Sequence, residues 1–318
     1  MFADGAAQYL KEIQHKRSAD TVAFHIKLLL PFIGLLPLEQ VHDATLEAFK
    51  DERLEGLDFG NGKPPKPVSP TTVNRSLEVV STILNRAARA WRDEEGWPWL
   101  SVAPPLITRL DESPRPAYPL DWEEQDLLFQ ELPVHLQEMA NFAVTTGLRD
   151  DNVCGLKWSW EKMVPEVGRS VFIIPAGVFK TKVPHVVILN DEAWSIIESK
   201  RKARELAKSL GEEVTDFVFA YTAKGKTGRI ETINNNGWQN ARKRVSLTQV
   251  RVHDLRHTYA SRLRQAGVVR EDRAALLGHE GRSMPEHYAT ADIGRLIELS
   301  NRVLDRAGTR TLLRVVNG

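Results

Sequence analysis

Four short stretches of the sequence gather side chains that can hold an anion, move a proton or attack an electrophile. They read TTGLRDDNV, FKTKVPH, VHDLRHTYASRL and LGHEGRSMPEHY. Arginine and lysine bind anionic oxygens, histidine titrates near neutrality, and a tyrosine phenol becomes a nucleophile where its surroundings favour the phenolate. Because the stretches are far apart in the chain, an active site built from them requires a fold that brings them together.

Each stretch has a simpler interpretation when it is taken alone. Arg149 could form a surface ion pair, which is worth about 0–1 kcal/mol, and Lys180 could keep a hairpin soluble. Tyr288 alone is more typical of a core tyrosine with a satisfied hydroxyl. His253 and His257 have the i, i+4 spacing of a helical metal site, but a glutamate and an obvious third ligand are missing. A metal hydrolase is therefore a minor alternative, and we expect no metal and no cofactor.

The first hundred residues have the periodicity of helices. Apolar residues predict two helices near 20–33 and 44–54, and a longer one that begins after Ser69, a good N-cap, with Pro70 at its first position. The apolar side of the longer helix carries Val73, Leu77, Val80, Leu84, Ala87 and Trp91. The opposite side is either a solvated face or an anion-binding one, and it carries Arg75, Asn85, Arg86, Arg89 and Arg92.

Two stretches rich in proline interrupt the helical pattern. The first, GLDFGNGKPPKPV, predicts an exposed loop that carries Lys63 and Lys66. The second, VAPPLITRLDESPRPAYPLD, has five prolines, which resist both helix and central strand. We therefore expect two domains, at 1–112 and 118–318, joined by a linker at 113–117.

The part of the chain after this linker predicts helices around a hairpin. The stretch DWEEQDLLFQELPVHLQEMANFAVTTG is helical in pattern, and Arg149 follows it at the start of a further helix. In RSVFIIPAGVFKTKVPHVVILND, two β-rich runs flank a turn-prone middle, which predicts a hairpin with Lys180 and Lys182 near its tip. Helical patterns then return, and in one of them His253 and Arg256 lie three residues apart on one face.

The composition excludes several classes of protein. The 318 residues are 42% hydrophobic, and 43 basic against 42 acidic side chains give a formal net charge of +1. Only local clusters of charge can therefore attract nucleic acid. The single cysteine, Cys154, excludes an internal disulfide framework and suits a reducing compartment. Because neither a signal peptide nor ~20 consecutive apolar residues are found, we expect a soluble cytoplasmic protein with no membrane contact.

Taken together and in this order, the four stretches resemble the tyrosine recombinase or phage integrase family. The shared pattern is G-L-R, a hairpin lysine, H-x-x-R, L-G-H and a tyrosine nine residues after that histidine. The resemblance implies an α-rich two-domain fold, with an all-α (SAM-like) core-binding domain and a mixed α/β catalytic domain that contains a small antiparallel sheet. On this resemblance the catalytic residues are Arg149, Lys180, His253, Arg256, His279 and Tyr288.

The resemblance implies a site-specific DNA recombinase of the integrase type. It would cleave and rejoin strands through a covalent 3′-phosphotyrosyl link at Tyr288, without metal or ATP. Arg149 and Arg256 would clamp the non-bridging phosphate oxygens and lower the cost of the phenolate. His253 would transfer a proton or donate to the phosphate, and by resemblance His279 donates at the same phosphate.

At three positions the match to the family's pattern is ambiguous or departs from it. By resemblance Lys180 is the general acid that protonates the departing 5′-hydroxyl, and Lys182 is its rival because hairpin tips are hard to register. The family often has an acidic residue three positions after the first arginine, where this chain has Asn152. This substitution leaves open what supports Arg149. Many members also have a proline in the second hairpin strand, where this chain has Ile188.

The expected partner is double-stranded DNA at an attachment or recombination site. Local basic clusters would supply salt-sensitive affinity and position the phosphate. The DNA-binding candidates are Arg75, Asn85, Arg86, Arg89, Lys63, Lys66, Arg242, Lys243 and Arg244. We expect a cytoplasmic, nucleoid-associated protein, and because the helices begin at the start of the sequence we expect no additional arm-site domain before them.

The resemblance also implies protein partners. A tetramer would assemble on DNA, with the C-terminal segment docked on a neighbouring subunit, and an accessory bending or directionality protein could take part. The amphipathic stretch DIGRLIELSNRVLDRAG after Tyr288 could equally pack within its own domain.

Two other functions share these features. A catalytically silent DNA-binding homologue would occupy sites without strand exchange, although the intact set of six residues argues against it. A type IB topoisomerase-like enzyme, which nicks and recloses strands, shares fold and chemistry and would relax supercoiled plasmid at random sites.

Overall fold

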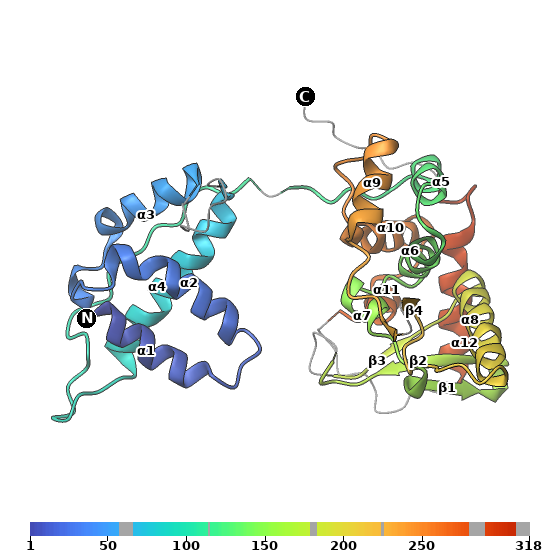
Figure 1. Cartoon of the computed structure of the whole chain (residues 1–318), viewed down its shortest axis with the longest axis horizontal. Coiled ribbons are helices and arrows are strands. Elements are labelled where there is room, and N and C mark those ends of the chain that lie inside the picture. The colour runs from blue at the N-terminus through green and yellow to red at the C-terminus, as the bar shows by residue number, and fades with distance from the viewer. Residues whose placement is uncertain (57–65, 114, 179–182, 224–225, 280–289, 310–318) are drawn as a thin grey trace. The chain divides into compact units, whose positions relative to one another are not determined.

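The chain divides into two compact units, each with its own apolar core. The computed structural model describes residues 1–56, 66–113, 115–178, 183–223, 226–279 and 290–309. The units are Met1–Arg115 and Pro116–Gly318 (Figure 1), and the division falls inside the proline-rich stretch. No helix in the described ranges combines the length and the apolarity needed to cross a membrane.

The N-terminal unit is helical. Its described elements are α1 (Phe2–Ile13), α2 (Ala19–Ile33), η1 (Leu38–Gln40), α3 (Asp43–Glu55) and α4 (Pro70–Arg89) (Figure 1). The helices predicted near 20–33 and 44–54 are confirmed as α2 and α3. α4 begins as predicted, with Ser69 as its N-cap and Pro70 in its first turn. Its apolar stripe is buried against α1, α2 and α3.

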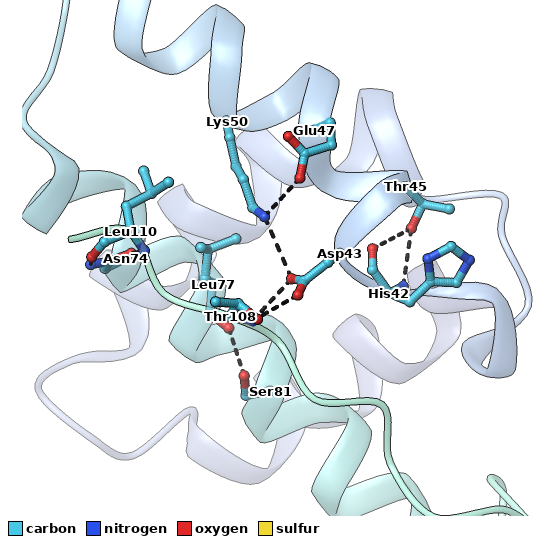
Figure 2. Close-up of polar contacts among 10 residues, drawn as sticks. All are labelled: His42, Asp43, Thr45, Glu47, Lys50, Asn74, Leu77, Ser81, Thr108 and Leu110. Atoms are coloured by element: carbon cyan, nitrogen blue, oxygen red, sulfur yellow. Dashed lines mark hydrogen bonds and ion pairs between the residues drawn. The ribbon is translucent and has the colours of Figure 1, made fainter.

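The segment after α4 is tied back onto the helices. The carboxylate of Asp43, at the start of α3, accepts the N–H of Thr108 at 2.9 Å (Figure 2). The side chain of Asn74, in α4, accepts the N–H of Leu110 at 2.8 Å and donates to its carbonyl at 2.9 Å. The same amide donates to Glu112 at 2.7 Å. Side-chain bonds therefore hold the backbone to this unit as far as Glu112.

The C-terminal unit combines helices with two small sheets. Its described helices and 3-10 turns are α5 (Trp122–Gln130), α6 (Val134–Thr146), α7 (Asp150–Cys154), η2 (Trp158–Trp160), η3 (Pro165–Val167), α8 (Asp191–Ser209), α9 (Asn236–Arg244), α10 (Val252–Gln265), α11 (Arg270–Leu277), α12 (Thr290–Asn301) and η4 (Arg302–Leu304). Its described strands are β1 (Glu161–Val164), β2 (Arg169–Ile174), β3 (His185–Val187), β4 (Ala220–Ala223) and β5 (Lys226–Arg229).

Both sheets are antiparallel. In the first, β2 lies between β1 and β3, so that Phe172 pairs with Glu161 on one side and with Val187 on the other. In the second, β4 pairs with β5. The predicted hairpin is confirmed as β2 and β3. β1 and the β4–β5 hairpin were not predicted, because their short runs EKMV, AYTA and KTGR have little apolar alternation.

Two apolar clusters fill the C-terminal unit. The larger surrounds α6, whose Met139 and Phe142 are fully buried. The smaller joins α10, α11 and α12, and α12 contributes Ile293, Leu296 and Ile297 to it. α12 therefore packs within its own unit. Helices in the first unit, and helices with small antiparallel sheets in the second, confirm the predicted fold class.

Candidate active site

Four of the six expected catalytic residues lie in the described part of the C-terminal unit. Arg149 is the N-cap residue of α7. His253 and Arg256 lie near the start of α10. His279 follows the last turn of α11. Three separate helix ends thus supply these side chains.

Some of the other residues singled out in the sequence cannot be placed. The following lie outside the described residues: Lys63, Lys180, Lys182 and Tyr288. Asn152, where the family often has an acidic residue, is buried in α7, and its backbone N–H donates to the carbonyl of Arg149 at 2.9 Å. Ile188, where many members have proline, is buried directly after β3.

Arg256 joins two of the three helix ends. Its side chain is buried, with 5% of the residue exposed. Nη1 donates to the carbonyl of Gly147 at 2.6 Å and Nη2 to the carbonyl of Leu277 at 2.7 Å. Gly147 precedes Arg149 by two residues, and Leu277 precedes His279 by two. The Arg256 guanidinium therefore fixes the backbone just before Arg149 and His279. It has further N–H donors that these two bonds do not use.

Two glycines in the left-handed conformation make the turns at these ends. Gly147 ends α6 with φ 68°, and Gly278 ends α11 with φ 62°. A Cβ on Gly147 would overlap the ring of Tyr259 in α10, so the turn before Arg149 packs directly on the helix that carries Arg256. Beyond Gly278 the N–H of His279 donates to the carbonyl of Ala274 at 3.0 Å, as in a Schellman cap.

Burial, together with the cations of the site, keeps its histidines neutral. Burial, followed by the charges of Arg256 and Arg149, lowers the pKa of His279 from its ordinary value. For His253, burial is again the largest cause of a lowered pKa, followed by His257 and the two arginines. Each imidazole is therefore neutral at neutral pH and can donate one N–H. Burial and the charge of Arg149 lower the pKa of Arg256 to about 10, which still leaves it protonated.

The two-histidine metal hypothesis gains no support. The rings of His253 and His257 pack edge to face, with centroids 4.8 Å apart and an interplanar angle of 87°. In the described ranges, no group of three or more His, Cys, Asp or Glu side chains is placed to hold a metal ion.

His185 is a further site residue that sequence reasoning missed. It is the first residue of β3, pairs with Ile174 of β2, and is 3% exposed. Burial, and then the charges of Arg256, Arg149 and His279, lower its pKa to about 3. The imidazole is therefore buried within electrostatic reach of three candidates. A three-residue strand is too short for alternation to reveal which side chains point inward.

Four DNA-binding candidates of the N-terminal unit lie on one side of α4. Arg75 and Arg89 are exposed. Arg86 is also exposed, but its Nε forms an ion pair with Glu12 of α1 at 2.6 Å. The amide of Asn85 donates to a carbonyl one turn earlier at 2.8 Å. Arg75 and Arg89 are therefore the members of this face most available to an anionic partner.

The candidates on α9 divide in the same way. Arg242 is half-buried and donates to a carbonyl of the following loop at 2.7 Å, which closes the C-terminal end of the helix. Arg244 donates to the carbonyl of Glu131 at 2.6 Å. Lys243 is exposed, as is Lys66 before α4. Arg242 and Arg244 thus have structural contacts within the unit, whereas the two lysines face solvent.

Several known proteins are similar to this chain in sequence or in fold. The phage integrase family matches residues 123–294, which is more than half of the chain. The integrase of Salmonella phage P22 is 27% identical over 335 residues, covering 97% of this chain and 81% of the relative. A lambda integrase (75–356) dimer bound to a COC′ core site has a TM-score of 0.60 at 17% identity, covering 92% of this chain and 94% of that one. A lambda integrase tetramer bound to a Holliday junction has a TM-score of 0.59 at 18% identity, covering 90% and 79%. With the helix ends that carry Arg149, His253, Arg256 and His279 joined in one site, these matches show that the chain belongs to the phage integrase family, the tyrosine-type site-specific recombinases.

Proposed function

We propose that this recombinase cleaves and rejoins DNA through a covalent 3′-phosphotyrosyl intermediate at Tyr288, without metal or ATP. The observation that carries the proposal is the pair of bonds from Arg256 to the carbonyls of Gly147 and Leu277. These bonds hold Arg149 and His279 around one guanidinium. A phosphate placed there would meet two fixed cations and neutral imidazole donors, which is an arrangement suited to charge developing on phosphoryl oxygens.

In the first step the phenol of Tyr288 gives up its proton to the neutral imidazole of His253, its oxygen attacks the phosphorus, and the bond from phosphorus to the 5′-oxygen breaks. Arg149 and Arg256 would hold the non-bridging oxygens, and His253 and His279 would donate hydrogen bonds to the same group. The products are a 3′-phosphotyrosyl link and a free 5′-hydroxyl. Because the ester bond is kept in that link, a 5′-hydroxyl from another strand can reverse the step without an energy source.

The departing 5′-oxygen needs a proton, and we assign its donor to Lys180, with Lys182 as the rival. A substrate whose bridging 5′-oxygen is replaced by sulfur separates the two, because a thiolate leaves without protonation. The lysine that acts as the acid is the one whose replacement by alanine slows cleavage of the oxygen substrate but not of the sulfur substrate. Equal slowing of both substrates by both substitutions would remove the general-acid role.

The exposed basic residues would bind the DNA backbone. Arg75 and Arg89 on α4, Lys243 on α9 and Lys66 are the candidates whose side chains face solvent. The lambda integrase structures described above contain DNA, one as a dimer on a core site and one as a tetramer on a Holliday junction. We therefore propose double-stranded DNA as the substrate and a tetramer as the active assembly.

The part of the chain that would dock in trans is narrowed by the packing of α12. Because Ile293, Leu296 and Ile297 are buried in their own unit, α12 packs within that unit and its apolar face is not available to a neighbouring subunit. Arg306 and Asp126 form a bidentate ion pair at 2.7 and 2.9 Å, which also fixes the chain just after η4. We propose, as the family resemblance implies, that the C-terminal segment beyond these contacts docks on a neighbouring subunit.

The test is adduct formation on a nicked duplex that carries the target site, recovered from the DNA flanking the gene. Wild-type protein should yield a covalent protein–DNA adduct, and Tyr288→Phe should yield none while binding the site with equal affinity. No adduct with wild type, together with sequence-specific binding, would indicate a silent homologue. Relaxation of supercoiled plasmid at random sites would instead indicate a topoisomerase-like enzyme.

A further inference from the structure

Asp150 stands next to Arg149 and binds a segment far away in the chain. It is the first residue of α7. Its carboxylate accepts the hydroxyl of Thr232 at 2.5 Å and the backbone N–H of Ile233 at 2.9 Å. The thiol of Cys154, one turn later, donates to the same carboxylate at 3.3 Å. Both oxygens of Asp150 are therefore engaged, and most of the bonding points to the chain that follows β5.

The same segment continues into the cap of α9. The hydroxyl of Thr232 accepts the N–H of the residue two positions later at 3.0 Å. The carbonyl of Thr232 accepts the side-chain amide of Asn235 at 3.2 Å, and the Asn235 oxygen in turn caps α9 by accepting the N–H of Gly237 at 2.9 Å. α9 is held in place by Trp238, which is fully buried. A chain of hydrogen bonds thus links α9 to the residue beside Arg149.

α7 needs such an anchor because it is only five residues long. A helix of this length is not stable by itself, so its direction is set by what holds its ends. The turn at Gly147 holds the approach to Arg149, and the carbonyl of Arg149 accepts two N–H groups of α7, at 2.9 and 3.0 Å. Any rotation of α7 therefore moves Arg149 with it, and the contacts of Asp150 resist that rotation.

We propose that Asp150 is a positioning residue for Arg149, and that Thr232 and Asn235 extend this support to the helix that carries the exposed Lys243. The proposal rests on the proposed function, since Arg149 is assigned there to the scissile phosphate. It supplies the support that an acidic residue at the Asn152 position would otherwise provide. A backbone contact of DNA with α9 would then favour the arrangement in which Arg149 faces the phosphate.

The first experiment removes the Thr232 hydroxyl. Thr232→Val deletes the bond to Asp150 and the acceptor for the N–H two residues later, whereas Thr232→Ser keeps both. With DNA in excess over its dissociation constant, we expect Thr232→Val to slow single-turnover cleavage roughly 10- to 100-fold, the range expected for a displaced catalytic group. DNA affinity should stay within about twofold, and Thr232→Ser should cleave at nearly the wild-type rate. Cys154→Ala, which removes the longer bond to the same carboxylate, is the matched control and should slow cleavage less than about threefold.

The second experiment asks whether the effect passes through Arg149. In an Arg149→Lys background the planar guanidinium and its fixed donors are already lost. Adding Thr232→Val to that background should therefore slow cleavage by less than about threefold. Multiplicative losses in the double variant, or a wild-type cleavage rate for Thr232→Val alone, would overturn the proposal. Adduct formation by the wild-type protein is measured before any variant is compared. If it forms no adduct at all, the proposed function itself has failed.

Discussion

Two sets of arginines, one in each unit, are held in opposite ways. On α4 of the N-terminal unit, Arg75 and Arg89 lie exposed along a helix whose other side fills the core. In the C-terminal unit Arg256 is buried and bonded to two backbone carbonyls. Exposed charges are screened by salt and contribute affinity without fixed geometry, whereas buried, bonded charges are preorganised. The contrast fits the roles proposed above, in which the exposed set contributes to DNA binding and the buried arginine to stabilisation of the transition state.

The burial of Arg256 has an energetic reason. A charge taken out of water is costly unless hydrogen bonds replace its hydration, and here the carbonyls of Gly147 and Leu277 do so. Both carbonyls belong to helix ends, where the last C=O groups lack partners within the helix. The guanidinium therefore satisfies acceptors that the fold would otherwise leave open, and it gains a fixed position in return.

The largest expected effect is that of Arg256→Ala. It should slow cleavage at saturating DNA by roughly 100- to 1000-fold or more, since a fixed donor to the phosphate is lost. It should also lower the free energy of unfolding by about 3 kcal/mol, because two charge-assisted bonds disappear. Single-turnover cleavage and urea unfolding measure the two effects. Lys162→Ala, an exposed change on β1, is the control, and an equal loss of cleavage in both variants would contradict the assignment.

A smaller loss is expected from Gly147→Ala. The residue has φ 68°, and the new Cβ would overlap Tyr259 and lie 2.9 Å from Cδ2 of Leu277. Gly168→Ala is the matched control, because Gly168 has φ 63° with nothing within 4 Å of its Cβ position. We expect about 1 kcal/mol of destabilisation at Gly168 from the backbone alone, and about 2–4 kcal/mol at Gly147, where overpacking adds to it. Equal destabilisation in thermal unfolding would show that the turn before Arg149 is not tightly packed.

The buried histidines predict a dependence of stability on pH. The folded pKa of His185 is about 3, below its unfolded value of about 6.5, so the unfolded chain binds the extra proton first. Stability is therefore complete above pH 6.5 and falls as the pH drops toward 3, by up to about 1.4 kcal/mol per unit. Lowered pKa values of His253 and His279 act in the same direction.

Hydrogen exchange at α10 amides reports this unfolding in the C-terminal unit. Between pH 6.5 and 5.5, His185→Asn should lose about 1 kcal/mol less than wild type, because its side chain does not titrate. A pH slope that is the same in both proteins would show that His185 is protonated in the folded state without cost.

The smallest expected effect belongs to the exposed set. Arg75→Ala and Arg89→Ala should each weaken DNA binding and reduce the slope of log affinity against log salt by about 0.9, one phosphate contact apiece. Cleavage at saturating DNA should be unchanged in rate, because both residues belong to the N-terminal unit and none of the proposed catalytic roles falls on that unit. A slowed cleavage step in either variant, at saturation, would break the contrast between the two units.

The sequence was informative where local chemistry decides the outcome. Ser69 and Pro70 predicted the start of α4. The family was identified by the order and spacing of six residues, Arg149, Lys180, His253, Arg256, His279 and Tyr288. It was not informative where distant segments meet. The bonds from Arg256 to backbone carbonyls at 147 and 277 leave no trace in residue types, and neither does the ion pair that occupies Arg86. His185 and Asp150 were missed for the same reason, since their partners are brought to them only by the folded chain.

The most direct test of the account is to identify the residue that carries the DNA. Adduct trapped on a nicked duplex can be digested with protease and nuclease, and the modified peptide sequenced by mass spectrometry. We predict a nucleotide linked through its 3′-phosphate to Tyr288, in a peptide that also contains His287. A nucleotide on any other side chain, or a link through a 5′-phosphate, would contradict it.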